Sequence, residues 1–257
     1  MYSNHKLIAF ETIVVKEVRR FSRIWVQTLV PPAITIALYF VIFGNLVGRR
    51  VGEMGGFQYM EFIVPGLIMM AVIQNSYSNV VSSFFSQKFQ RSVEELLVSP
   101  VPNYVILSWF IVGGMARGLA VGAIVTSLAL FFADIQVAHP LITISVVLLT
   151  SIVFSLAGFI NAVFANSFDD ISIIPTFVLT PLIYLGGVFY SAQLLPPFWQ
   201  TVSALNPIFY MVNTFRYGFL GSSDVDVIWA FMILGIFAVS LYAGCIWLLR
   251  HGTGIRN

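Results

Sequence analysis

The stretch that decides the fold runs from residue 179 to residue 216 and reads LTPLIYLGGVFYSAQLLPPFWQTVSALNPIFYMVNTFR. It begins as an apolar membrane segment, which ends at Ser191. The remainder is too apolar for an ordinary solvent loop, and its prolines interrupt it too often for one spanning helix. Non-helical backbone at membrane depth must be buried in protein or line a wet cavity. We therefore predict that residues 191–222 form a re-entrant gate at the outer end of a helix bundle.

The composition places the rest of the chain in a membrane as well. Of the 257 residues, 58% are hydrophobic and only 9% are charged, whereas a soluble domain carries about 25% charged residues. The mean hydropathy is +0.91. One membrane domain accounts for the whole length, so we expect a single all-α integral membrane domain over residues 1–257 with no soluble enzyme domain.

Apolar segments of roughly 20 residues are long enough to cross a bilayer as helices. We predict six transmembrane helices, at about 24–44, 57–83, 104–132, 141–165, 171–190 and 227–249. Within residues 1–23, apolar side chains recur at helical spacing from residue 4 onward, with basic side chains on the other faces. This pattern predicts an amphipathic helix in the headgroup plane. The alternative is a plain juxtamembrane anchor.

The longest polar gap between the spans is SQKFQRSVEELLVSPVPN, residues 86–103. Ser92 and Glu95 form a capping-box pattern that opens a short helix. This helix carries apolar Leu96 and Leu97, although loops of this kind are normally polar. It is therefore either a solvated loop helix or a helix that docks on a partner.

Two features inside the spans indicate a path for a solute. The second span carries polar side chains on one face and beside it: Gln74, Asn75, Ser78, Asn79 and Ser82. They either line a path or hydrogen-bond neighbouring helices. Arg117 lies near the middle of the third span, where a charge costs about 2.5–3.5 kcal/mol. Arg117 is therefore either a path residue or a clamp on the carbonyls of a broken helix.

Glycines recur every four residues in the third span, at Gly114, Gly118 and Gly122. This spacing lets two helix backbones approach closely. The partner helix belongs either to the same chain or to a second copy.

The distribution of basic residues orients the chain. With a cytoplasmic N-terminus, the inner segments hold nine Lys and Arg residues and the outer segments hold three. The positive-inside rule favours this orientation. We therefore expect both termini and residues 86–103 in the cytoplasm, and residues 191–222 on the outer side.

Motifs for catalysis or nucleotide binding are missing from the sequence. There is no G-x-x-x-x-G-K-S/T, so the chain cannot cradle ATP phosphates itself. There is also no H-E-x-x-H, no G-x-S-x-G and no acidic residue near the centre of a span. We expect no cofactor, no metal, no catalytic site and no nucleic-acid partner. The chain then needs an outside energy source, or it acts as a stand-alone channel or facilitator. A third hypothesis is an intramembrane lipid-modifying enzyme.

The stretch 179–216 resembles the signature of the ABC-2 type permeases, the membrane subunits of one class of ATP-binding-cassette exporters. The matching positions are Leu179, Leu182, Leu185, Gly186, Val188, Leu195, Pro196, Pro207, Ile208, Tyr210 and Arg216. The rest of the chain resembles bacterial inner-membrane members of this family in layout and in phrases such as FIVPGLIMM, RSVEELLVSPVP and FDDISIIPTFVLTPL.

The resemblance implies two permease copies, as a homodimer or as a pair with a relative, and two copies of a separate ATPase that binds ATP and Mg. It implies ATPase coupling through the N-terminal helix and residues 86–103, at Arg19, Arg20, Arg91, Glu94, Glu95, Leu96 and Leu97. Spans 1, 2 and 5 would line the path, with Gln74, Asn75, Ser78, Asn79, Arg117 and Phe177. Leu195, Pro196, Pro207, Tyr210 and Arg216 would mark the outer gate. The expected cargo is lipidic, amphiphilic, drug-like or a glycan.

Overall fold

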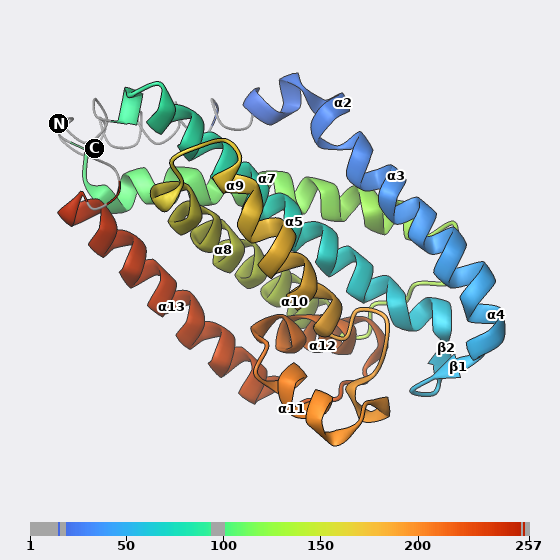
Figure 1. Cartoon of the computed structure of the whole chain (residues 1–257). Coiled ribbons are helices and arrows are strands. Elements are labelled where there is room, and N and C mark those ends of the chain that lie inside the picture. The colour runs from blue at the N-terminus through green and yellow to red at the C-terminus, as the bar shows by residue number, and fades with distance from the viewer. Residues whose placement is uncertain (1–14, 16–18, 94–100, 253, 255–257) are drawn as a thin grey trace.

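The computed structural model describes residues 15, 19–93, 101–252 and 254. The chain forms a bundle of long helices with a short β-hairpin at one end (Figure 1). The helices are α2 (Trp25–Thr28), α3 (Val30–Tyr39), the π-helix η1 (Phe40–Val47), α4 (Gly48–Val51), α5 (Tyr59–Phe89), α7 (Asn103–Ala129), α8 (Pro140–Phe164), α9 (Asp170–Ile174), the π-helix η2 (Pro175–Leu179), α10 (Thr180–Leu185), the 3-10 helix η3 (Ala192–Leu194), α11 (Pro197–Ala204), α12 (Pro207–Leu220) and α13 (Val227–His251). The strands are β1 (Glu53–Met54) and β2 (Phe57–Gln58).

Within the described ranges, four helices are long and apolar enough to cross a membrane. They are the continuous run Trp25–Val51, α7, α8 and α13, which correspond to the first, third, fourth and sixth predicted spans. The second predicted span falls on α5, which has 31 residues but carries the polar stripe. The fifth falls on the shorter apolar run Asp170–Leu185.

The first helix continues beyond the predicted end of its span at residue 44. Apolar residues of η1 extend it, and α4 carries it to Val51. Residues 44–51 are thus helical, and the antiparallel pair Glu53 and Gln58 follows. Gly52, Gly55 and Gly56 have positive φ angles of 74°, 62° and 84°, which the tight reversal requires.

α5 is the central helix and packs most extensively against α7 and α8. The glycine spacing of α7 makes this approach possible. A side chain at Gly118 would collide with Ser76 of α5, and one at Gly114 with Ser155 of α8. The glycines therefore serve packing within this chain.

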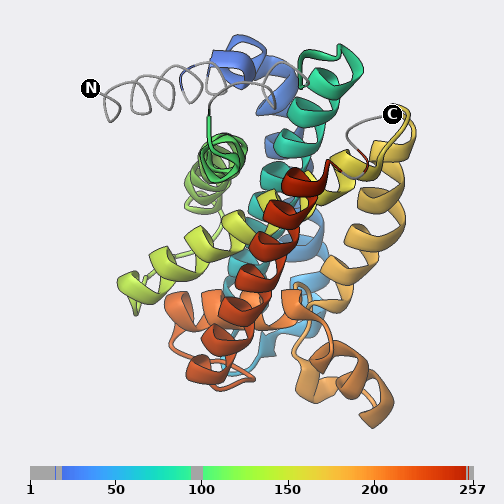
Figure 2. The ribbon, with the colours of Figure 1, turned by 90° about the vertical axis from the view of Figure 1, so that its left-hand side faces the viewer.

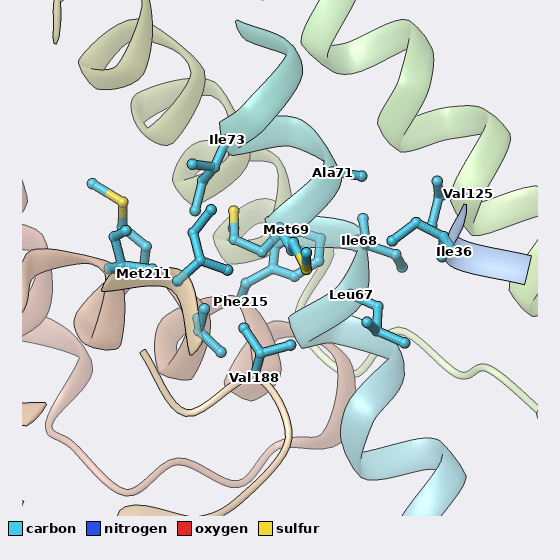
Figure 3. Packing of buried hydrophobic residues seen from close by; sticks show 14 of the residues in the cluster. Ile36, Leu67, Ile68, Met69, Ala71, Ile73, Val125, Val188, Met211 and Phe215 are labelled. Atoms are coloured by element: carbon cyan, nitrogen blue, oxygen red, sulfur yellow. The ribbon is translucent and has the colours of Figure 1, made fainter. Parts of the chain in front are cut away.

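The middle of α5 also anchors the core. Figure 3 shows Leu67, Ile68 and Met69 among side chains from several elements. Met211 and Phe215 of α12 and Val188 lie on one side, and Ile36 and Val125 lie on the other. The stretch that decides the fold is thus fixed directly to the central helix.

The two ends of the bundle carry different elements. The hairpin, α11 and α12 lie at one end, which we call the hairpin end, while α2 and the last turns of α5 and α13 lie at the other (Figures 1 and 2). The predicted gate and the first turn of α7 therefore lie at opposite ends.

Candidate transport cleft and the Arg216 network

A cleft of about 420 Å³ opens over α5. Its walls come from α2 and α3 on one side and from η2 and α10 on the other, and Figure 1 shows α3 and α10 flanking α5. The lining residues are Gln27, Pro31, Pro32, Gln74, Asn75, Ser78, Arg117, Pro175, Thr176, Leu179 and Thr180. The cleft therefore has a polar floor between proline-containing walls.

Most of the predicted path residues meet at this cleft, but two do not line it. Gln74, Asn75, Ser78 and Arg117 do. Asn79, one turn further along α5, is fully buried. Phe177 on η2 is 74% exposed and lies outside the lining.

Asn75 holds Arg117 in place at the cleft. Arg117 Nη2 donates to Asn75 Oδ1 at 3.2 Å, and Asn75 Nδ2 donates to the Ala71 carbonyl at 2.9 Å. The second bond fixes the amide so that its oxygen accepts from Arg117. Arg117 Nε is buried and has no hydrogen-bond partner in the part of the chain that the structure describes. Among the described residues, Arg117 forms neither an ion pair nor a bond to a carbonyl of a broken helix.

At the hairpin end, Arg216 of α12 is the centre of a buried network, with 2% of its surface exposed. Its Nη2 donates to the Gly187 carbonyl at 2.6 Å and its Nε to the Phe62 carbonyl at 3.3 Å. Its Nη1 donates to Asn213 Oδ1 at 3.1 Å. The guanidinium also lies 3.9 Å from the centre of the Phe62 ring. Arg216 thus joins α12 to α5 and to the turn after α10.

Asp224 extends this network to the end of the predicted fifth span. Its carboxylate accepts from Ser191 Oγ at 2.9 Å and from the Ala192 backbone N–H at 3.0 Å. Its own N–H donates to Asn213 Oδ1 at 3.4 Å. A cavity of about 170 Å³ lies beside these groups, lined in part by Arg216 and Asp224.

The model of the ABC-2 type transporter family matches residues 8–220. The chain belongs to the ABC-2 type transporter family. Inner membrane transport permease YadH of Escherichia coli (strain K12) is 59% identical over 250 residues, which cover 97% of this chain and 98% of that protein. Nodulation protein J of Rhizobium leguminosarum bv. trifolii is 25% identical over 195 residues, 74% of this chain and 73% of that protein. Nodulation protein J of Neorhizobium galegae is 23% identical over 219 residues, which cover 83% of this chain and 82% of that protein.

These matches confirm the resemblance that the signature and the phrase RSVEELLVSPVP indicate. The ABC-2 match ends at residue 220, where α12 also ends. It therefore includes the cleft and Arg216 but not Asp224.

Other positions predicted to mark the outer gate lie around α11 and α12. Leu195 and Pro196 precede α11, and Pro207 is the first residue of α12. Tyr210 Oη donates to the Ala204 carbonyl at 2.8 Å, which ties α12 back to α11.

Sequence reasoning missed three polar partners at this end. They are Asn213, Asp224 and Asn206, whose side chain caps α12 and donates to the Leu182 carbonyl at 2.6 Å. Asn213 stands three residues before Arg216, so the two share a helix face. That spacing could have identified Asn213. The role of Asp224 could not be predicted in this way, because its partners Ser191 and Ala192 lie more than 30 positions earlier in the chain.

Three of the residues expected to couple the permease to its ATPase lie within the described ranges, Arg19, Arg20 and Arg91. Arg19 and Arg91 are exposed, and Arg91 has a φ of 58° in the turn after α5. Arg20 instead contacts α5, where its Nη2 donates to the Asn79 carbonyl and Oδ1, both at 3.0 Å. Glu94, Glu95, Leu96 and Leu97 lie outside the described residues.

The start of α9 is fixed by Asp170, near the end of the bundle opposite the hairpin. Its carboxylate accepts from the backbone N–H groups of Asn166 at 2.9 Å and Ser167 at 3.1 Å. The acid at this helix start is therefore a local cap that complements the helix dipole.

Proposed function

We propose that this chain is the transmembrane permease subunit of an ATP-driven exporter in a bacterial inner membrane. The observation that carries the proposal is a polar cleft with the half-buried Arg117 inside a bundle of the ABC-2 family. The name of the E. coli relative, an inner membrane transport permease, supports the same activity. The cargo belongs to the lipidic, amphiphilic, drug-like or glycan classes.

The permease crosses the membrane six times, with α5 as the second span and Asp170–Leu185 as the core of the fifth. Both termini face the cytoplasm. The length of α5 and its place at the centre of the core support the second span. Residues 191–222 form a re-entrant gate at the outer side, and the packing of α12 against α5 supports this arrangement.

Two permease copies, most simply a homodimer, work with two copies of a separate ATPase, which binds ATP and Mg. Closure of the ATPase dimer pushes on residues 86–103 and on the N-terminal helix. A nucleotide can shift the two permease states only through contacts that differ between them. The absence of a phosphate-binding loop from this chain supports the need for a partner.

The partner is tested by purifying the tagged permease in mild detergent from its native membrane. We expect an ATPase with a phosphate-binding loop to co-purify with the wild type. It should be lost from the Glu94→Arg/Glu95→Arg variant, because the charge reversal repels the docking surface. Arg49→Glu/Arg50→Glu is the matched control, since both residues are exposed and precede the hairpin. Recovery of intact permease without any ATPase would contradict the exporter proposal.

A further inference from the structure

Arg117 supplies the one formal charge among the residues that line the cleft. None of these lining residues is acidic. On α5, the acid that precedes the cleft is Glu61, fourteen residues before Asn75 and thus about 21 Å away along the helix. Arg117 is half-buried, and a charge that is partly withdrawn from water without a counter-ion is costly. The cleft is therefore complementary to an anionic group.

The hydrogen-bonding capacity of Arg117 is also largely unused. A guanidinium has five N–H donors, and Arg117 makes one hydrogen bond, to Asn75, among the described residues. Its Nε is buried without a partner. Because the bond between Asn75 and Ala71 fixes the position of the guanidinium, the remaining donors are preorganised for a ligand. Arginine matches oxyanions such as phosphate and carboxylate in this way.

Two more donors at the cleft are unengaged. Gln74 and Ser78 lie four residues apart on one face of α5, and both line the cleft. Neither side chain hydrogen-bonds to another described residue, in contrast to Thr180, which donates to the Pro175 carbonyl at 2.9 Å. An oxyanion beside Arg117 can therefore accept from an amide and a hydroxyl as well.

The elements that form the two walls also carry exposed apolar side chains. Ile34 and Leu38 of α3 are 56% and 54% exposed, and Phe177 and Val178 of η2 are 74% and 48% exposed. An inorganic anion makes no use of this surface, whereas a hydrocarbon chain does. The polar floor and the apolar walls together fit a molecule with an anionic head and an apolar tail.

We infer that the cleft binds the oxyanion headgroup of an anionic amphiphile. Arg117, Gln74 and Ser78 donate hydrogen bonds to this headgroup. This inference rests on the proposed function, since it names the class of cargo for the same cleft. The apolar tail lies against α3 and η2. Phosphate, sulfate and carboxylate heads share the required chemistry.

Binding of dodecyl phosphate to the purified full-length permease in dodecyl maltoside tests this inference. The uncharged detergent has the same alkyl chain as dodecyl phosphate and competes for apolar surface. Any preference for dodecyl phosphate therefore comes from its headgroup. We expect saturable binding that weakens about tenfold in Arg117→Gln, because a charge-assisted bond is lost. Ser78→Ala/Gln74→Ala should weaken binding by a smaller factor. Arg50→Gln, which removes an exposed arginine of α4, is the matched control and should bind like the wild type.

Two outcomes would overturn the inference. The first is equal binding to wild type and to an Arg117→Gln protein that elutes as a folded species. The second is displacement by inorganic phosphate at the same concentrations as dodecyl phosphate, since the site would then recognise a free anion. The binding assay needs no ATPase. If the purification experiment contradicts the exporter proposal, a positive binding result therefore still stands.

Discussion

Arg216 donates a 2.6 Å hydrogen bond to the carbonyl of Gly187, a residue 29 positions earlier in the chain. Gly187 has a φ of 76°, a backbone conformation that favours glycine, and it forms the turn that ends the predicted fifth span. The carbonyl at this turn receives its donor from α12 rather than from its own helix. Arg216 thus ties α12 to the turn that follows α10.

Replacement of Arg216 by Ala should destabilise the protein strongly. It leaves the carbonyls of Gly187 and Phe62 without this buried donor, and an unsatisfied buried group costs about 1–3 kcal/mol. We expect a loss of about 3 kcal/mol in the free energy of unfolding, measured as a lower thermal midpoint in detergent. Arg250→Ala, in the exposed last turn of α13, is the control. Equal midpoints for the two variants would show that Arg216 does not hold this end together.

Glycine substitutions should separate close packing from helix propensity. Gly118→Ala places a methyl group against Ser76 and should destabilise the protein by about 1–3 kcal/mol. Gly244→Ala, in α13, meets no atom within 4 Å and should be neutral or slightly stabilising. Thermal unfolding of both variants measures the difference. A neutral Gly118→Ala would mean that α5 and α7 do not approach this closely.

Loss of Asp224 should loosen the segment after the fifth span. Asp224→Ala removes the acceptor for Ser191 and for the Ala192 N–H. We expect faster amide hydrogen exchange at residues 191–195, measured by mass spectrometry. Asp226→Ala is the matched control, because Asp226 caps α13 through Ile228 and Trp229. That variant should accelerate exchange only at the start of α13, and the same pattern in both variants would contradict the assigned contact.

Replacement of Arg20 should loosen the attachment of the chain before α2 to the central helix. Arg20→Ala removes bonds to the carbonyl and side chain of Asn79 and to Ser82. We expect faster cleavage around residues 19–24 by an added protease, while the core fragment survives. Arg19→Ala, the exposed neighbour, should leave the cleavage rate unchanged. If both variants are cut at the wild-type rate, the contact with α5 does not hold this segment.

Local patterns predicted the long helices and the polar stripe, because apolar run length and helical periodicity are properties of neighbouring residues. Helical spacing predicted that Gln74, Asn75 and Ser78 lie close together on α5, and the structure brings Arg117 of α7 to the same cleft. Their role in transport stays a prediction.

The position of Phe177 could not be predicted from helical periodicity. It lies in the π-helix η2, between Pro175 and Leu179, where wider turns shift the phase of the helix. A face predicted from ordinary helical spacing is therefore displaced, and Phe177 lies outside the cleft lining. The Asp224 contacts were equally hidden, since they join residues 33 positions apart through the folded chain.

The central claim is that a partner ATPase switches access to the cleft, and thiol labelling at Ser78 tests it most directly. Cys245 is the chain's single cysteine and is buried, so Ser78→Cys in a Cys245→Ala background carries one reporter at the cleft. The permease and its co-purified ATPase are placed in vesicles and treated with a membrane-impermeant thiol reagent, with and without ATP and vanadate. We predict that the side from which the reporter reacts changes when nucleotide is trapped. Identical labelling from both sides in both conditions would contradict an ATP-driven exporter.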